Sequence, residues 1–251
     1  MEGNVKINKW DAGHRLWPLP NFPWVMKQTW NDLLFAHFPV KIEKLRNFIP
    51  DVLPIDTYQG VAWIGIVSFQ MGEISLRWLP PLPGAKKFPQ LNVRTYITMD
   101  GKPGVYFFSL DAANKLVARV VKTLLPLPYW HACMKTEYLG ESIHFESKRE
   151  VDKTFEWNCN YRPSSKVYLA KKGSFDEWMA ERYCFYAVNK KGTALRCDIL
   201  HHRWPLQHAE VEIHQNTMLL SHGIQVEAAE PLFHFSKGME VRIWPLFTAL
   251  N

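Results

Sequence analysis

The sequence has few cysteines and no long hydrophobic run. Its four cysteines, Cys133, Cys159, Cys184 and Cys197, form no CxxC pair, so metal-binding and redox motifs built on such pairs have no support. No apolar segment approaches the roughly 20 residues that a membrane-spanning helix needs, and no leader segment with a basic start and an apolar core is recognisable. We therefore expect a cytoplasmic protein with reduced thiols and no membrane contact.

Signatures of several catalytic classes are also missing. The sequence contains no Walker loop, GxGxxG, GxSxG or HExxH motif, which removes the usual support for nucleotide binding, nucleophile-elbow hydrolysis and zincin chemistry. Ten histidines are present, including the pair His201-His202 and the spaced His208 and His214. Neither of these two sets has acidic neighbours at a recognised ligand spacing. We therefore expect no metal site and no other cofactor.

A dense basic stripe is absent as well. The 30 Lys and Arg residues exceed the 24 Asp and Glu residues by a net charge of +6, which is modest for a chain of 251 residues and indicates general solubility. No RNP-like strand accompanies the aromatic residues, so nucleic-acid binding is not expected. A hydrophobic content of 47% with 11 Trp and 15 Phe instead predicts an extensive packed core.

Hydrophobic periodicity predicts a protein built mainly from strands. Strands are expected over 29–38, 58–71, 131–138, 143–149 and 155–161, with further candidates after Arg182. Both faces of 58–71 are mainly apolar, so this strand should be buried on both sides. We expect one domain over 1–251, in which 1–22 is an irregular segment lying over the body.

Short helices are expected between the strands, over 40–49, 113–124 and 174–181. Ser174 stands three residues before Glu177, the capping-box spacing in which each side chain satisfies a free amide at the helix start. The Pro-rich stretch Leu79 to Pro89 is poorly suited to sheet pairing and should form a rim loop or lid.

The most informative stretch runs from Gln90 to Asp111 and predicts a hairpin with one polar face. Asn92, Arg94 and Tyr96 share this face, because strand side chains alternate with a period of two. A guanidinium on a core strand requires an anionic partner. That partner is either the carboxylate or phosphate of a ligand, or an internal carboxylate such as Asp111 or Glu181.

Several long segments, taken in order, resemble the YqjF-like family of uncharacterised bacterial proteins. They cover nearly the whole chain from Trp24 to Pro245 and read WVMKQTWNDLLFAHFPV, DTYQGVAWIGIVSF, QLNVRTY, GKPGVYFFSLDA, LPLPYWHACM, ERYCFYAV, HHRWPLQ and FHFSKGMEVRIWPL. This family is similar to the acetoacetate decarboxylase superfamily. The resemblance implies a mainly β fold, in which a curved antiparallel sheet closes into a double barrel or cone with a few short outer helices.

The same resemblance allows the decarboxylase chemistry to be checked. Acetoacetate decarboxylases form a Schiff base from a lysine whose pKa is lowered by a neighbouring lysine, among other surroundings. Their Arg-Glu pair and following Gly-Phe-Pro-Lys-Lys segment correspond best to Arg119-Val120 and to Leu127-Pro128-Tyr129-Trp130, so the acid and both lysines are missing. The adjacent pairs Lys86-Lys87, Lys171-Lys172 and Lys190-Lys191 fall in loop-like sequence. Schiff-base decarboxylation is therefore not expected.

The candidate ligand-binding residues are Arg94, Asn92, Tyr96, Tyr129, Gln90 and Arg119. Tyr129 could orient a ligand or donate a proton. Relatives usually carry Glu where Gln90 stands, so hydrogen bonding is expected there, unless Gln90 simply starts the strand. Arg119 follows Lys115 at helical spacing and either lies on a solvated basic face or, by the family match, in the pocket.

Three functions remain open at this point. The first is a barrel that binds a small anionic, carboxylate-type metabolite against Arg94. The second is a metal-free lyase, isomerase or hydrolase in which Asp111, Glu181 or His37 transfers a proton beside Arg94, although a buried, hydrogen-bonded core role fits His37 better. The third is a structural or regulatory protein, as a homo-oligomer, whose barrel interior is filled by aromatic side chains.

Overall fold

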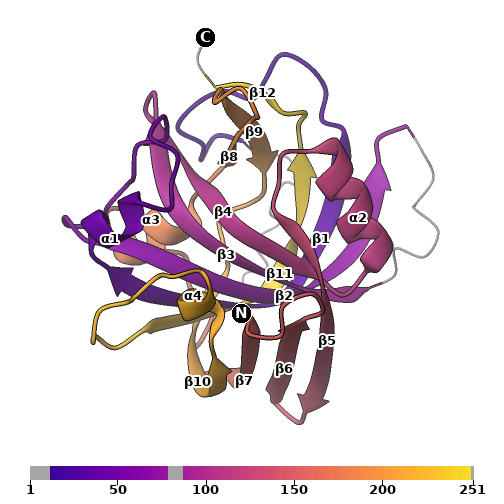
Figure 1. Cartoon of the computed structure of the whole chain (residues 1–251), viewed down its shortest axis with the longest axis vertical. Helices are drawn as coiled ribbons and strands as arrows, with labels where there is room; N and C mark the ends of the chain where they lie inside the picture. Colours follow the sequence, from indigo (N-terminus) through magenta and orange to yellow (C-terminus); the bar gives the residue numbers. More distant parts are fainter. Residues whose placement is uncertain (1–11, 79–86, 250–251) are drawn as a thin grey trace, which may run out of the picture.

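The computed structural model describes residues 12–78 and 87–249, whose strands join into one sheet (Figure 1). The strands are β1 (Met26–Val40), β2 (Ala62–Leu76), β3 (Phe88–Met99), β4 (Lys102–Ala112), β5 (Tyr129–Leu139), β6 (Ser142–Arg149), β7 (Glu156–Pro163), β8 (Cys184–Val188), β9 (Ala194–Leu200), β10 (Leu206–Asn216), β11 (Leu232–Ile243) and β12 (Phe247–Thr248). The helices are α1 (Ile42–Arg46), α2 (Lys115–Leu124), α3 (Phe175–Ala180) and α4 (Met218–Ser221).

The sheet closes on itself twice, which confirms the predicted double barrel. Its strand order is β12-β9-β8-β4-β3-β2-β1-β11-β10-β7-β6-β5. Pairing of β9 with β11 closes one ring, and pairing of β4 with β5 closes a second ring of β4, β3, β2, β1, β11, β10, β7, β6 and β5. The strands from β4 through β3, β2 and β1 to β11 therefore belong to both rings. We call the ring closed by β9 and β11 the first barrel and the other the second barrel.

The sheet is mixed, whereas the family resemblance implied an antiparallel one. β4 pairs in parallel with both β5 and β8, and the other named pairings are antiparallel. A parallel neighbour requires the chain to cross over before it returns, usually through a helix. α2 provides this crossover between β4 and β5.

The shared strands are buried on both faces because each barrel covers one face. On β1, Leu33 and Phe35 pack in the first barrel, whereas Leu34 and Ala36 pack in the core of the second. The prediction of two buried faces is confirmed for β2, of which Ala62 and most residues from Ile64 to Ile74 are buried. This arrangement explains why β1 and β2 read as nearly continuous apolar runs.

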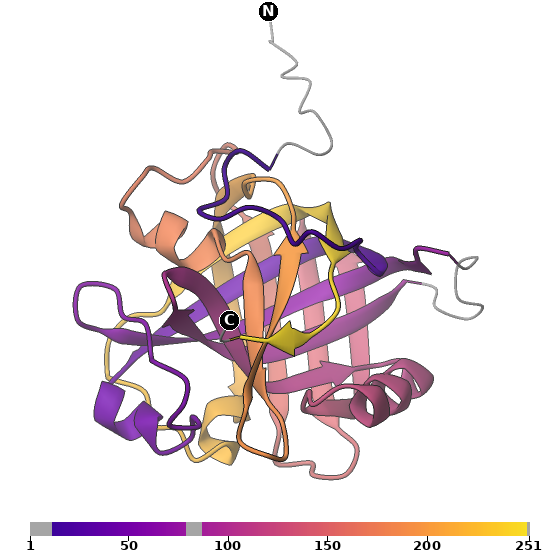
Figure 2. The ribbon, with the colours of Figure 1, turned by 90° about the horizontal axis from the view of Figure 1, so that it is seen from above.

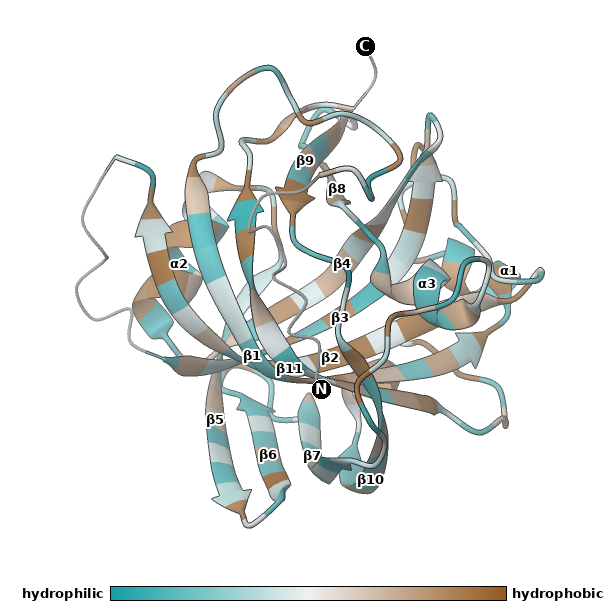
Figure 3. Ribbon diagram, turned by 180° about the vertical axis from the view of Figure 1, so that it is seen from behind, coloured by the Kyte–Doolittle hydropathy of each residue, from teal (hydrophilic) through white to brown (hydrophobic). Residues whose placement is uncertain are grey.

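Strands that belong only to the second barrel have one buried face. Burial alternates residue by residue along β6 and most of β7, and Figure 3 shows the corresponding alternation of hydrophilic and hydrophobic positions there. Large buried side chains fill this barrel, among them Trp157, Phe145 and Tyr161. The second barrel is therefore a packed core.

The predicted helices and strands are found, with shifted ends. The strand expected from residue 58 begins at Ala62, because Gln59 and Gly60 both have positive φ, at 51° and 81°, and turn the chain first. α1 is shorter than expected and ends at Arg46. At α3, the Oγ of Ser174 accepts from the amide of Glu177 at 3.2 Å, while the Glu177 carboxylate accepts from the amide of Gly173 at 2.6 Å.

Residues 12–22 contain no helix or strand and contact β9 of the first barrel. Arg15 Nη1 donates to the carbonyl of Ile199 at 2.9 Å, and Trp17 Nε1 donates to Asp198 at 3.3 Å. Most of the predicted rim loop, residues 79–86, lies outside the described residues. Among the helices that the structure describes, none has the length and apolar character to cross a membrane.

Candidate functional site

The first barrel encloses a cavity of about 640 Å³. Most of the side chains around it are aliphatic or aromatic and come from β1, β2, β4, α2 and β9. Residues of α2 line one end, and Ala180 and Arg182, at the end of α3, also line it. α2 and α3 lie at opposite ends of the barrel in both ribbon views (Figures 1 and 2).

A line of polar side chains on β3 interrupts the apolar wall. Gln90, Asn92 and Arg94 all face the cavity, as the two-residue period of a strand predicts. Their neighbours Leu91 and Val93 face the core of the second barrel. A break in register between Val93 and Arg94 leaves Arg94 opposite Phe107 of β4.

Arg94 lies among aromatic groups. Its Cζ is 5.5 Å from the ring centroid of Phe35 and 5.8 Å from that of Tyr96. Gly65 on the neighbouring strand is close to it, and a Cβ there would lie 3.6 Å from Arg94 Cγ but only 3.2 Å from His37 Nε2, so glycine at this position makes room for His37. Arg94 forms no ion pair with any residue that the structure describes, and its buried Nε has no hydrogen-bond partner there.

Both internal partners considered for Arg94 are engaged elsewhere. Asp111 is buried and accepts hydrogen bonds from Arg149, whose Nη2 lies 2.8 Å from Asp111 Oδ1. Glu181 accepts from the hydroxyl of Tyr183 and lies 3.9 Å from Arg203 Nε. Internal pairing of Arg94 with Asp111 or Glu181 was therefore the wrong alternative.

A second cavity arginine, Arg182, is already paired. Its Nη1 donates to Asp56 Oδ2 at 2.6 Å, and its Nε donates to the carbonyl of Trp178. Burial alone would raise the pKa of Asp56, but the charge of Arg182 and hydrogen bonds from Arg182 and Thr98 bring it below its ordinary value. Of these two arginines, only Arg94 lines the cavity without a carboxylate partner among the described residues.

Gln90 and Tyr129 form a polar pair in the cavity wall. Gln90 Nε2 donates to the Tyr129 hydroxyl at 3.2 Å. Burial raises the pKa of Tyr129, so the phenol keeps its proton and can donate it in a hydrogen bond. Gln90 Oε1 and Asn92 Oδ1 are buried and have no partner in the described part of the chain. They are acceptors that a ligand with a donor group could use.

Tyr96 packs in the first barrel but is not among the side chains that line the cavity. Its side chain is fully buried, and its hydroxyl hydrogen-bonds His37 Nε2. Burial, with the nearby charges of Arg94 and His234, lowers the pKa of His37 well below its ordinary value. His37 is therefore a neutral, buried, hydrogen-bonded histidine, as its core role required.

Arg119 lies outside the cavity, on the exposed side of α2. The neighbouring Lys122 is also exposed, with its Nζ 3.5 Å from the ring centroid of Trp130. These positions correct the expectation that Arg119 contributes to the pocket. The helical spacing that indicated a solvated basic face was the better guide.

The described cavity wall contains neither lysine nor carboxylate. Of the lysine pairs, Lys87 is 51% exposed and lies 3.8 Å from Asp32, Lys86 falls outside the described residues, and the remaining four side chains are exposed. No group of three or more His, Cys, Asp or Glu within 12–78 and 87–249 is placed to hold a metal ion.

Three features of the cavity were not anticipated. Arg182, His201 and one face of α2 all line it. The segments ERYCFYAV and HHRWPLQ did contain the first two residues. The alternation of apolar and polar residues in these segments did not predict that the two side chains share a cavity. His201 lies just after β9, and Arg182 lies just after α3.

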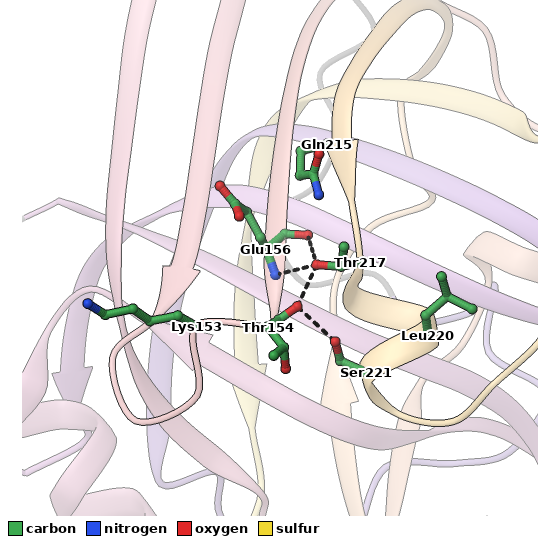
Figure 4. A pocket seen from close by; sticks show the side chains of 7 residues that line it. All are labelled: Lys153, Thr154, Glu156, Gln215, Thr217, Leu220 and Ser221. Atoms are coloured by element: carbon green, nitrogen blue, oxygen red, sulfur yellow. Dashed lines mark hydrogen bonds between the residues drawn. The ribbon is translucent and has the colours of Figure 1, made fainter.

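A second depression lies on the surface, where the β6–β7 connection meets the end of β10 and α4 (Figure 4). Several of its polar groups form local hydrogen bonds. The hydroxyl of Thr217 accepts from the amide of Glu156 at 3.0 Å, and Ser221 Oγ donates to the carbonyl of Thr154 at 2.8 Å. These bonds fasten the loop to α4, so the depression offers few free groups to a ligand.

Comparison with solved structures gives the same fold. An acetoacetate decarboxylase from Legionella pneumophila matches with a TM-score of 0.60 at 10% identity, over 100% of this chain and 94% of that one. The enduracididine biosynthesis enzyme MppR, complexed with pyruvate, matches with a TM-score of 0.61 at 7% identity, over 91% of both chains. The fold is therefore of the acetoacetate-decarboxylase type.

Sequence comparison identifies the family. The protein "Uncharacterized protein YqjF" of Bacillus subtilis is 46% identical over 228 residues, which cover 91% of this chain and 94% of the relative. The model of the DUF2071 family, described as "Uncharacterized conserved protein", matches residues 27–240. The chain therefore belongs to the DUF2071 family, as a YqjF-like protein with an acetoacetate-decarboxylase-like fold.

Proposed function

We propose that the protein binds a small anionic, carboxylate-type metabolite in the cavity of the first barrel, without Schiff-base decarboxylation. The observation that carries the proposal is the unpaired charge of Arg94 in an apolar wall. A buried charge is costly unless it is paired, and a planar guanidinium binds carboxylates through two parallel hydrogen bonds. A ligand carboxylate at Arg94 would supply the missing partner.

The other groups on β3 support a ligand with a second polar group. The carbonyl oxygens of Asn92 and Gln90 have no partner and lie on the same strand face as Arg94. A hydroxyl or amide beside the carboxylate would donate to them. The fold relative MppR was solved in complex with pyruvate, which is a small carboxylate.

Proton-transfer catalysis has less support. Asp111 is paired with Arg149 outside the described cavity wall, and His37 is fully buried behind it. The cavity residue His201 is neutral, because burial lowers its pKa to about 4. A structural role with a filled barrel has no support either, since the first barrel is hollow.

A thermal-shift screen tests the proposal. Keto acids, hydroxy acids and phosphorylated metabolites are added to the wild type and to Arg94→Met, with Arg119→Met as the matched exposed control. We expect carboxylates to raise the melting temperature of the wild type and of the Arg119 variant, but not of the Arg94 variant. Equal stabilisation of all three proteins by every anion would refute an anion site at Arg94.

A further inference from the structure

We infer that the ligand is a carboxylic acid with an extended apolar chain, whose carboxylate lies at Arg94 and whose chain runs toward α2. This inference rests on the proposed anion site and adds the chemical class of the remainder of the ligand. It follows from the length, the lining and the opening of the cavity.

The cavity is long in the direction of the strands. On β1 its lining residues run from Met26 to Phe35, and on β2 from Val67 to Leu76. At about 3.3 Å per strand residue, Met26 and Phe35 are separated by about 30 Å along the strand. A keto acid of three or four carbons at Arg94 would leave most of such a cavity unfilled.

The remaining wall is suited to methylene groups. Leu125, Leu127 and Tyr129, which follow α2 in the chain, line the cavity, and Met71 and Ile74 line it from β2. Four of these five carry no hydrogen-bonding N–H or O–H group. The one polar side chain, Tyr129, receives a hydrogen bond from Gln90. An extended chain would bury apolar surface here without leaving polar atoms unpaired.

α2 gives this end of the cavity an apolar rim. Leu116, Val117, Val120 and Val121 all line the cavity, because positions three and four apart fall on one face of a helix. Leu116 is nevertheless 66% exposed and Val120 is 45% exposed. Side chains that belong both to the wall and to the surface mark the place where the cavity opens.

The charges are arranged for an acid rather than an uncharged lipid. Lys115 and Lys122 lie exposed on α2, with Lys115 Nζ 3.7 Å from Glu150 Oε2, and the first turn of this helix has no acidic residue. Basic groups around an opening raise the local concentration of anions. An acid attracted to this rim would insert and find its ion-pair partner at Arg94.

Calorimetric titration with a series of straight-chain acids tests the inference. Butanoate, hexanoate, octanoate and decanoate are compared below their micelle concentrations, with 1-octanol as the uncharged probe. Each buried methylene contributes about 0.8 kcal/mol, so affinity should rise about fourfold per methylene until the cavity is filled. Arg94→Met should lose tenfold or more for octanoate, and 1-octanol should bind much more weakly than octanoate.

A variant that shortens the cavity provides the second measurement. Val121→Trp fills space at the α2 end and should abolish the gain from hexanoate to decanoate while butanoate still binds. Thr123→Trp, on the exposed side of the same helix, should behave as the wild type. If short acids bind in an Arg94-dependent manner but affinity does not rise with chain length, this inference fails and the anion site stands. If no acid depends on Arg94, the anion site itself fails.

Discussion

Arg94 and Arg182 approach the same aromatic ring but have different partners. Their Cζ atoms lie 5.8 Å and 4.9 Å from the ring centroid of Tyr96. Arg182 is paired with Asp56 at 2.6 Å, whereas Arg94 has no carboxylate partner in the described structure. Two arginines in one cavity wall therefore have different roles, one structural and one available to a ligand.

Replacing each arginine by methionine should separate these roles. Arg182→Met leaves the Asp56 carboxylate without its ion pair and should lower the free energy of unfolding by about 2–4 kcal/mol. Arg94→Met removes an unpaired charge and should change it by less than about 1 kcal/mol, or raise it. Urea denaturation of both variants measures the difference. Comparable losses in the two proteins would mean that Arg94 has a structural partner after all.

Tyr96 should stabilise the protein without contacting the ligand. Tyr96→Phe removes the partner of His37 Nε2, and His37 Nδ1 is already without one, so unfolding should become easier by about 1–3 kcal/mol. The affinity for carboxylates should stay within twofold. Tyr129→Phe alters a hydroxyl in the cavity wall and is the matched control, with a clear loss of affinity expected. Weaker ligand binding by the Tyr96 variant alone would place its hydroxyl in the site.

Stability should fall as the pH is lowered from neutral. Burial lowers the pKa of His201 to about 4 and that of His222 to about 4, with Arg149 adding to the effect at His222. Between about pH 6.5 and pH 4 the unfolded chain binds more protons than the folded one, so acid favours unfolding. His201 alone should contribute a loss of about 2 kcal/mol at pH 5 relative to neutral pH.

The measurement for this prediction is urea denaturation at several pH values between 7.5 and 4.5. His201→Gln should flatten the pH dependence, whereas replacement of the exposed His208 should leave it unchanged. A wild-type protein that gains stability from pH 7 to pH 5 would show that the buried histidines are not neutral.

Acetoacetate should not form a covalent adduct. The described cavity wall has no lysine that could form a Schiff base, and Lys122 lies exposed against Trp130, outside that wall. Incubation with acetoacetate and borohydride, followed by intact-protein mass spectrometry, should leave the mass unchanged. An acetoacetate decarboxylase treated in parallel is the positive control. A reduced lysine adduct in this chain would overturn the argument.

The polar face of β3 could be predicted because it depends on local alternation. Gln90, Asn92 and Arg94 are two residues apart, and a strand period places them together whatever surrounds them. The ion-pair partners of the buried carboxylates, such as Asp111, could not be predicted in this way. Arg149 is 38 residues from Asp111, and the sequence contains several arginines that could have taken its place.

Local sequence patterns also could not predict that the sheet closes into barrels. β9 and β11 pair through Leu200 and Arg242, and the double barrel was expected only from the family resemblance. At Arg119 the local pattern and the family resemblance gave different predictions. Its helical spacing with Lys115 indicated a solvent-exposed position, whereas the family match suggested a position in the pocket. Arg119 is exposed on α2, in agreement with the helical spacing.

The central claim is that Arg94 binds the carboxylate of a ligand, and arginine side-chain NMR tests it most directly. In protein labelled with ¹⁵N-arginine, the Nε–H signal of Arg94 is assigned by its loss in Arg94→Met. Its Nε has no partner in the described structure, so titration with octanoate should shift this signal downfield and saturate at the calorimetric affinity, while that of Arg182 stays in place. An unchanged Arg94 signal under saturating octanoate would contradict the account.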